Sequence, residues 1–238
     1  GGLAILGAYT WSKAISMGDS AIDSEGIADT FNWSLERSIP RYHYPHFFKA
    51  TWIYELPIGA GKALGLSGIV NTLFGGWQLT GNHQIRSGNA LSISTSGLVS
   101  PVGTVRPDLV SGQSIVANSD APINFRGFAG GTPYLNRAAF TNPPVHAGGQ
   151  NVIQRPGTLG PYLPNIRGPH FVNEDIGMSK IFRFTETANF ELKATFLNPF
   201  NRHGRGDPIT NIRDPNFGQI TGSQRGPRNI ELAARITF

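Results

Sequence analysis

The segment NIELAARITF (residues 229–238) alternates apolar and polar side chains almost without a break. Because successive side chains in an extended strand point to opposite faces, this alternation predicts a β-strand with one apolar side. The apolar side carries Ile230, Leu232, Ala234, Ile236 and Phe238. A strand of this length must bury that side either in a protein core or in lipid.

The same period recurs along the chain and predicts about six long strands. They are expected at residues 3–12, 46–56, 77–87, 175–184, 189–196 and 229–238. Strands of soluble proteins average about 5 to 6 residues, whereas membrane-spanning strands take about 9 to 11. Aromatic residues lie toward the strand ends, where a girdle would meet the membrane interfaces: Trp11, Trp52, Tyr54, Trp77, Phe182, Phe184 and Phe238. The pattern favours an all-β fold, an antiparallel transmembrane β-barrel segment.

The polar sides of these strands are predicted to face the lumen of the barrel. The lumen-facing residues are Lys49, Thr51, Glu55, Gln78, Thr80, Asn82, Gln84, Arg86, Glu191, Lys193, Thr195, Glu231 and Arg235. Two residues on the apolar side break the pattern, His83 and Lys180. A lysine on the lipid side costs about 2 to 4 kcal/mol at the midplane, so Lys180 is expected near a rim of the barrel.

The connections between the predicted strands are unequal in length. Long links are expected at 13–43, 88–169 and 198–227, while 185–187 is tight and the Gly-rich link 58–74 has room for a helical turn. Short turns on one side and long loops on the other are typical of outer-membrane barrels. The stretch 88–169 is too long for a structureless connection, so it is predicted to be a large folded extracellular loop.

The composition excludes several classes of protein. Charged residues are 15%, below the roughly 25% of soluble domains. The net charge of +5 comes without dense Lys/Arg runs, so no nucleic-acid partner is expected, whereas an acidic surface such as lipopolysaccharide suits this charge. The chain has no cysteine, which excludes disulfides and thiolate metal sites. It begins without Met, in strand-like alternation, and is expected to be part of a longer chain.

No catalytic residue, cofactor or metal is predicted. A nucleophile with its base is not recognisable, and GLSG (65–68) lacks the spacing of a nucleophile elbow. The histidines of HYPH (43–46) have no matching ligands at metal-site spacing. Loop oxygens leave calcium binding and Asx-Pro turns as alternatives: Asp207, Asn211, Asp214 and Asn216. An acidic loop surface is expected at Asp19, Asp23, Glu25 and Asp29.

Several stretches, in this order, cover nearly the whole chain: GAYTWSKAIS, WIYELPIGAG, FGGWQLTGNHQIRSGNALSIS, YLNRAAF, NIRGPHF, DIGMSKIFRFTET, FELKATFLNPFN and FGQITGSQRGPRNIELAARITF. The chain resembles the C-terminal part of a TonB-dependent outer-membrane receptor barrel of the long-loop, acidobacterial type. The resemblance implies that residues 1–238 form the C-terminal strands of a larger, 22-stranded barrel in the bacterial outer membrane. The plug domain and the upstream strands would lie outside this sequence.

The resemblance also implies a function and partners. The expected function is uptake of a scarce or bulky solute, with loops 13–43, 88–169 and 198–227 capturing the ligand. The expected partners are outer-membrane lipid and lipopolysaccharide, the receptor's own plug domain, TonB and the barrel-assembly machinery. Physical reasoning agrees that further strands are needed, because six cannot close a barrel and an open sheet edge cannot face lipid.

Ile230, Leu232, Ala234, Ile236 and Phe238 resemble the C-terminal signal that the barrel-assembly machinery recognises. The alternative is an ordinary last strand whose apolar side covers a soluble core. We expect deletion of Phe238 to lower the amount of protein in the outer membrane, measured by surface labelling. Unchanged surface levels would remove this interpretation.

Two other functions remain open from the sequence. One is a secreted or surface-anchored β-sandwich adhesin that binds glycans through loop aromatics such as Tyr134 and Tyr162. The other is a receptor-derived scaffold, a structural subunit of a surface assembly. Membrane fractionation separates the adhesin from the other two.

Overall fold

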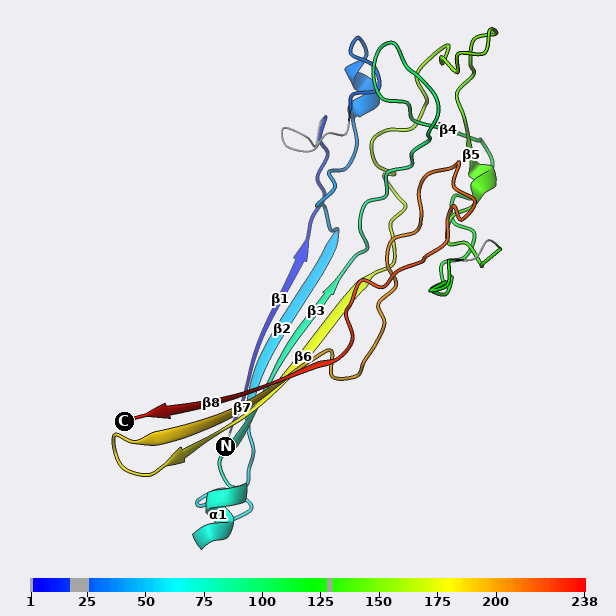
Figure 1. Ribbon diagram of the computed structural model, residues 1–238. Coiled ribbons are helices and arrows are strands. Elements are labelled where there is room, and N and C mark those ends of the chain that lie inside the picture. Colours follow the sequence, from blue (N-terminus) through cyan, green and yellow to red (C-terminus); the bar gives the residue numbers. More distant parts are fainter. Residues whose placement is uncertain (1, 18–25, 128–129) are drawn as a thin grey trace.

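The computed structural model describes residues 2–17, 26–127 and 130–238, and these form one long antiparallel sheet with loops at one end (Figure 1). The sheet has six strands in the order β1-β2-β3-β6-β7-β8. They are β1 (Leu3–Trp11), β2 (His46–Glu55), β3 (Trp77–Arg86), β6 (Phe171–Arg183), β7 (Asn189–Leu197) and β8 (Asn229–Thr237). Each pairs antiparallel with the next, so the predicted all-β antiparallel fold is confirmed.

The strand register aligns the apolar sides of all six strands on one face of the sheet and the polar sides on the other. Residues directly opposite each other in antiparallel strands share a face. One apolar row therefore crosses all six strands through Ile5, Trp52, Gly81, Ile176, Phe196 and Ile230. Gly81 is required in this row, because a Cβ there would lie 2.2 Å from the indole of Trp52.

The predicted strand boundaries hold within about two residues, except at β6. This strand starts at Phe171 and not at Asp175. The polar run Asn173, Glu174 and Asp175 hides the alternation in the sequence, but pairing with β3 continues to Arg86 opposite Phe171. Cross-strand pairing thus extends the strand into residues 171–174, which the side-chain pattern left outside both the predicted strand and the predicted loop.

The connections follow the predicted division into short and long. At one end lie α1 (Gly68–Phe74), in the Gly-rich link, and the turn 184–188, where Phe184 N–H donates to Ala188 O at 2.9 Å. The three long links lie together at the other end, the loop end (Figure 1). Among the described residues, no helix is long and apolar enough to cross a membrane.

The largest buried core lies in the loops and not on the sheet. It draws on the second and third long links, which also contain β4 (Asp108–Leu109), the 3-10 helix η2 (Arg137–Ala139) and β5 (Phe140–Thr141). Its members are Leu91, Ile93, Ala121, Tyr134, Leu135, Ala139, Phe140, Leu159, Leu163, Ile212, Phe217 and Ile220. The prediction that 88–169 forms a folded loop is confirmed. The first link carries a further 3-10 helix, η1 (Trp33–Glu36).

The apolar face of the sheet is uncovered. Leu232 is 80% exposed and Ile236 is 69% exposed, and no second sheet packs on them in the described part of the chain. A β-sandwich would bury this face against another sheet. The described residues therefore form no β-sandwich, and the exposed apolar face is one that lipid can solvate.

Candidate functional site

The polar face of the sheet brings together every residue predicted to face the lumen. The register places Lys49 opposite Gln84, Thr51 opposite Asn82 and Glu55 opposite Gln78. On the other half of the sheet, Glu191 lies opposite Arg235 and Thr195 opposite Glu231. Strand β6 adds four polar residues that the sequence reasoning did not include: Asn173, Asp175, Ser179 and Arg183. The mixed charge of this face suits a hydrated interior or polar contact with a plug.

The charged and polar residues on the apolar face all lie near its rims. Lys180 lies opposite Trp77, the first residue of β3, and its ammonium donates to the carbonyl of Gly75. The same ammonium lies 5.6 Å from the Trp77 ring centroid and 4.8 Å from that of Phe182. The predicted position near a rim is thus found, where the free-energy cost of charge in lipid falls.

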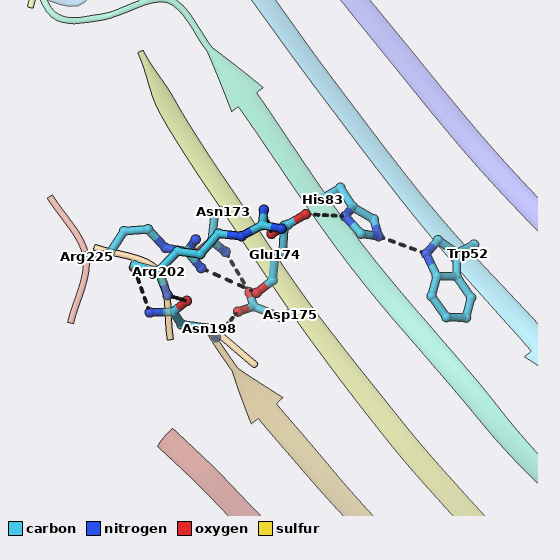
Figure 2. A network of polar contacts seen from close by, with 8 residues as sticks. All are labelled: Trp52, His83, Asn173, Glu174, Asp175, Asn198, Arg202 and Arg225. Carbon is cyan, nitrogen blue, oxygen red and sulfur yellow. Dashed lines mark hydrogen bonds and ion pairs between the residues drawn. The ribbon is translucent and has the colours of Figure 1, made fainter. Parts of the chain in front are cut away.

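His83 and Glu174 lie opposite each other near the loop end of the same face (Figure 2). Trp52 Nε1 donates to His83 Nε2 at 2.9 Å. Glu174 accepts a 2.7 Å bond from Arg202, which comes from the loop after β7. His83 and Glu174 therefore each have a polar partner, which lowers the cost of placing them beside lipid.

The same network ties the third loop to the sheet (Figure 2). Asn198 N–H donates to Asp175 Oδ1 at 3.3 Å, and Asn198 Oδ1 accepts from Arg202 N–H at 2.9 Å. Asn198 Nδ2 also donates to the carbonyl of Gly226 at 3.0 Å. One asparagine in the left-handed region, with φ of 51°, thus holds both ends of the loop together.

A loop junction continues the polar face at the loop end. The guanidinium of Arg86 stacks between Tyr44, 4.1 Å from the ring centroid, and Phe171, 4.6 Å away. Arg86 also donates to Asn89 Oδ1 at 2.9 Å, and Asn89 Nδ2 donates to Asp207 Oδ2 at 2.7 Å. These residues belong to β3, β6 and all three long links. The barrel wall and the loops are therefore mechanically connected here.

Arg167 makes a second connection between loops. Its Nη1 donates to the carbonyl of His43 at 2.6 Å, and its Nη2 lies 2.8 Å from His43 Nδ1. Burial lowers the pKa of this guanidinium. His46 instead bonds to Tyr9 Oη at 2.8 Å, so the two histidines of HYPH do not converge. The described residues contain no group of three His, Asp or Glu side chains that could hold a metal.

Two of the four candidate calcium ligands, Asn211 and Asp214, serve as turn residues. Asn211 Oδ1 accepts from Arg213 N–H at 3.0 Å, and Asp214 Oδ1 accepts from Asn216 N–H at 2.8 Å. These are Asx turns, the second alternative from the sequence. Of the acidic loop residues, Asp29 likewise caps Phe31 N–H at 2.8 Å, while Asp19, Asp23 and Glu25 lie outside the described residues.

The prediction that Tyr134 and Tyr162 bind glycans is wrong, because both rings are buried. Tyr134 and Tyr162 are 8% and 4% exposed. Tyr134 packs in the loop core, and its hydroxyl donates to the carbonyl of Arg167 at 2.7 Å. Neither ring is available to stack on a sugar.

The residues of the predicted assembly signal lie on the apolar face of β8. Ile230, Leu232, Ala234 and Ile236 face Phe196, Ala194, Leu192 and Phe190, respectively. Phe238 follows the strand and is 98% exposed. The role of these residues in assembly stays a prediction.

Asp108 and Arg155 provide a pH-sensitive contact in the loop assembly. Burial by itself raises the pKa of Asp108, but the bonds from Arg155 and Thr158 outweigh it and lower the pKa below 3.8. The two Arg155 contacts are 2.8 Å each, and Thr158 N–H donates at 2.9 Å. A lowered carboxylate pKa stabilises the fold above the unfolded value, and this contribution is lost as pH falls through the folded value.

We therefore expect the Thr158 amide to lose protection from hydrogen exchange as pH falls below about 4. Asp108→Asn should remove this pH dependence while lowering protection at neutral pH. The amide of Asn136, which is bonded to the carbonyl of Ile115 at 2.8 Å, serves as the reference. Parallel pH profiles for Thr158 in the two proteins would contradict the assignment.

Comparison with known proteins agrees with this geometry. Residues 1–231 match the protein family described as outer membrane beta barrel domain. No curated protein and no protein of solved structure gave a significant match. The match confirms the predicted location in the bacterial outer membrane and the contact with its lipid. The family description specifies a barrel and not its cargo. This chain belongs to the outer membrane β-barrel domain family.

Proposed function

We propose that residues 1–238 are the C-terminal wall and three extracellular loops of a TonB-dependent outer-membrane receptor that takes up a scarce or bulky solute. The loop junction is the observation that carries this proposal. Arg86 stands on the polar face of the wall and contacts Tyr44 of the first long link and Asn89 of the second, and Asn89 in turn bonds to Asp207 of the third. A ligand captured by the loops would therefore act directly on the wall and on whatever fills the lumen.

The open edges of the sheet support a larger barrel. In the described part of the chain, β1 pairs only with β2, and β8 only with β7. Unpaired backbone groups cost several kcal/mol each in hydrocarbon, so both edges require further strands. We place these strands upstream, in a barrel of 22 strands, with the plug domain against the polar face. No catalytic role is proposed for the chain.

Uptake in living cells tests this function. Cells that produce the intact protein should accumulate at least one solute from a panel of ferric chelates, cobalamin and oligosaccharides. An uncoupler of the proton gradient, or loss of TonB, should abolish accumulation while surface binding persists. Uptake that persists without TonB or the proton gradient would mean that the protein is an open channel and not a receptor. If no solute of the panel is taken up, the scaffold function would be favoured.

A substitution pair connects that experiment to the loop junction. Arg86→Ala removes two cation–π contacts and one hydrogen bond, so we expect surface binding of the solute to weaken about tenfold. Arg183→Ala is the matched control, because Arg183 is on the same face at the short-connection end. Equal loss of binding in both variants would show that the junction has no special role.

A further inference from the structure

The helix α1, between β2 and β3, exposes an unusual apolar surface. None of its residues is buried. Ile69 is 79% exposed, and Val70, Leu73 and Phe74 are each more than half exposed. Moreover, the stretch 63–82 contains no charged residue. A helix of seven residues is too short to be stable in water by itself. Contacts outside the helix must therefore stabilise it, and an apolar phase covering this surface would add to them.

The four apolar side chains occupy one side of α1. Their spacing of i, i+1, i+4 and i+5 places them on a single helical face. The polar residues Asn71 and Thr72 lie on the other side. Asn71 turns toward the protein, because its Oδ1 accepts a 2.8 Å bond from Ala60 N–H. The apolar side therefore points away from the chain.

The C-terminal end of α1 is fixed to the apolar face of the sheet. Trp77 Nε1 donates to the carbonyl of Leu73 at 3.1 Å, and Lys180 Nζ donates to that of Gly75. Both Trp77 and Lys180 stand on the face that lipid solvates. Phe182 belongs to the same face, and Phe184, in the neighbouring turn, is 71% exposed. The surface of α1 thus continues the lipid-facing surface at the short-connection end.

We propose that α1 lies in the inner, periplasmic leaflet of the outer membrane as an interfacial anchor, with Ile69, Val70, Leu73 and Phe74 inserted among the acyl chains. We infer lipid and not a protein partner, because the apolar side of α1 is continuous with the strand surface that faces lipid. Amphipathic helices bind in this way at the boundary between headgroups and acyl chains. The cation of Lys180 then stays at the rim, bonded to the end of the helix.

Spin-label accessibility tests this proposal. The chain has no cysteine, so single cysteines can be introduced at Ile69, Leu73 and Phe74. Any cysteine outside residues 1–238 is first replaced by serine, and the intact protein is reconstituted in vesicles of phosphatidylethanolamine and phosphatidylglycerol. Thr72, on the polar side of α1, is the matched control. Leu232 on the apolar strand face and Gln113 in a loop provide the lipid and water references.

We expect nitroxides at Ile69, Leu73 and Phe74 to collide more with oxygen than with a water-soluble nickel chelate, as at Leu232. The label at Thr72 should show the reverse preference, as at Gln113. Water-like values at all α1 positions would overturn the proposal, and so would labels that neither reagent reaches, because these would indicate a protein partner. Heat-modifiable gel mobility verifies that each variant is folded. The measurement needs no solute or TonB, so its outcome is independent of the uptake experiment.

Discussion

Arg106→Met should destabilise the packing of the first long link on the second by about 3 to 5 kcal/mol, because Glu36 would remain buried without its counter-charge. The Glu36 and Arg106 side chains are only 5% and 6% exposed. Arg106 donates to the two carboxylate oxygens at 3.0 and 2.6 Å. It also donates to the carbonyl of Gly26, and Glu36 accepts from Ala28 N–H at 2.9 Å. Hydrogen exchange of the Ala28 amide measures the change.

Two variants control this result. Lys62→Met breaks an ion pair with Glu55 of 2.8 Å that is more exposed, so loop exchange should stay as in the wild type. The double variant Glu36→Leu with Arg106→Met removes both charges, and it should recover part of the lost stability. Recovery stays incomplete because the backbone groups of Gly26 and Ala28 lose their partners. Wild-type exchange in Arg106→Met alone would show that the pair contributes nothing.

Ile5→Arg should destabilise the membrane-inserted protein by about 2 kcal/mol, whereas Leu6→Arg should be tolerated. The two residues are neighbours on β1, are both aliphatic, and are 65% and 73% exposed. Only their faces differ, since Ile5 lies opposite Trp52 and Leu6 lies opposite Thr51. An arginine at position 5 would meet acyl chains, and one at position 6 would meet the polar face. Urea unfolding of the protein in vesicles, followed by gel mobility, measures the difference.

The result distinguishes lipid from water as the solvent of the apolar face. Solvent exposure alone predicts that arginine at position 5 and arginine at position 6 change the stability equally, because Ile5 and Leu6 are similarly exposed. Equal tolerance of arginine would mean that the apolar face is not in contact with hydrocarbon. A greater loss for Leu6→Arg would reverse the assignment of the faces.

Much of the sheet could be predicted from the sequence, because strand alternation is a local property. The faces of Lys49, Gln84 and Leu232 follow from neighbours one and two positions away. The start of β6 could not be predicted, because Glu174 interrupts the pattern and its ion pair is with Arg202, which follows β7. The helical turn in the Gly-rich link was recognisable, but the direction of its apolar side was not.

The sequence by itself determined which segments are strands, which side of each is apolar, and which connections are long. Only the tertiary structure decided how the loops pack and connect to the wall. Glu36 meets Arg106, and Arg86 meets Tyr44, across long separations in irregular chain. Irregular backbone has no period from which a partner can be read, so such contacts exist only once the whole loop assembly has folded. Strand faces differ because the geometry of the extended backbone imposes them residue by residue.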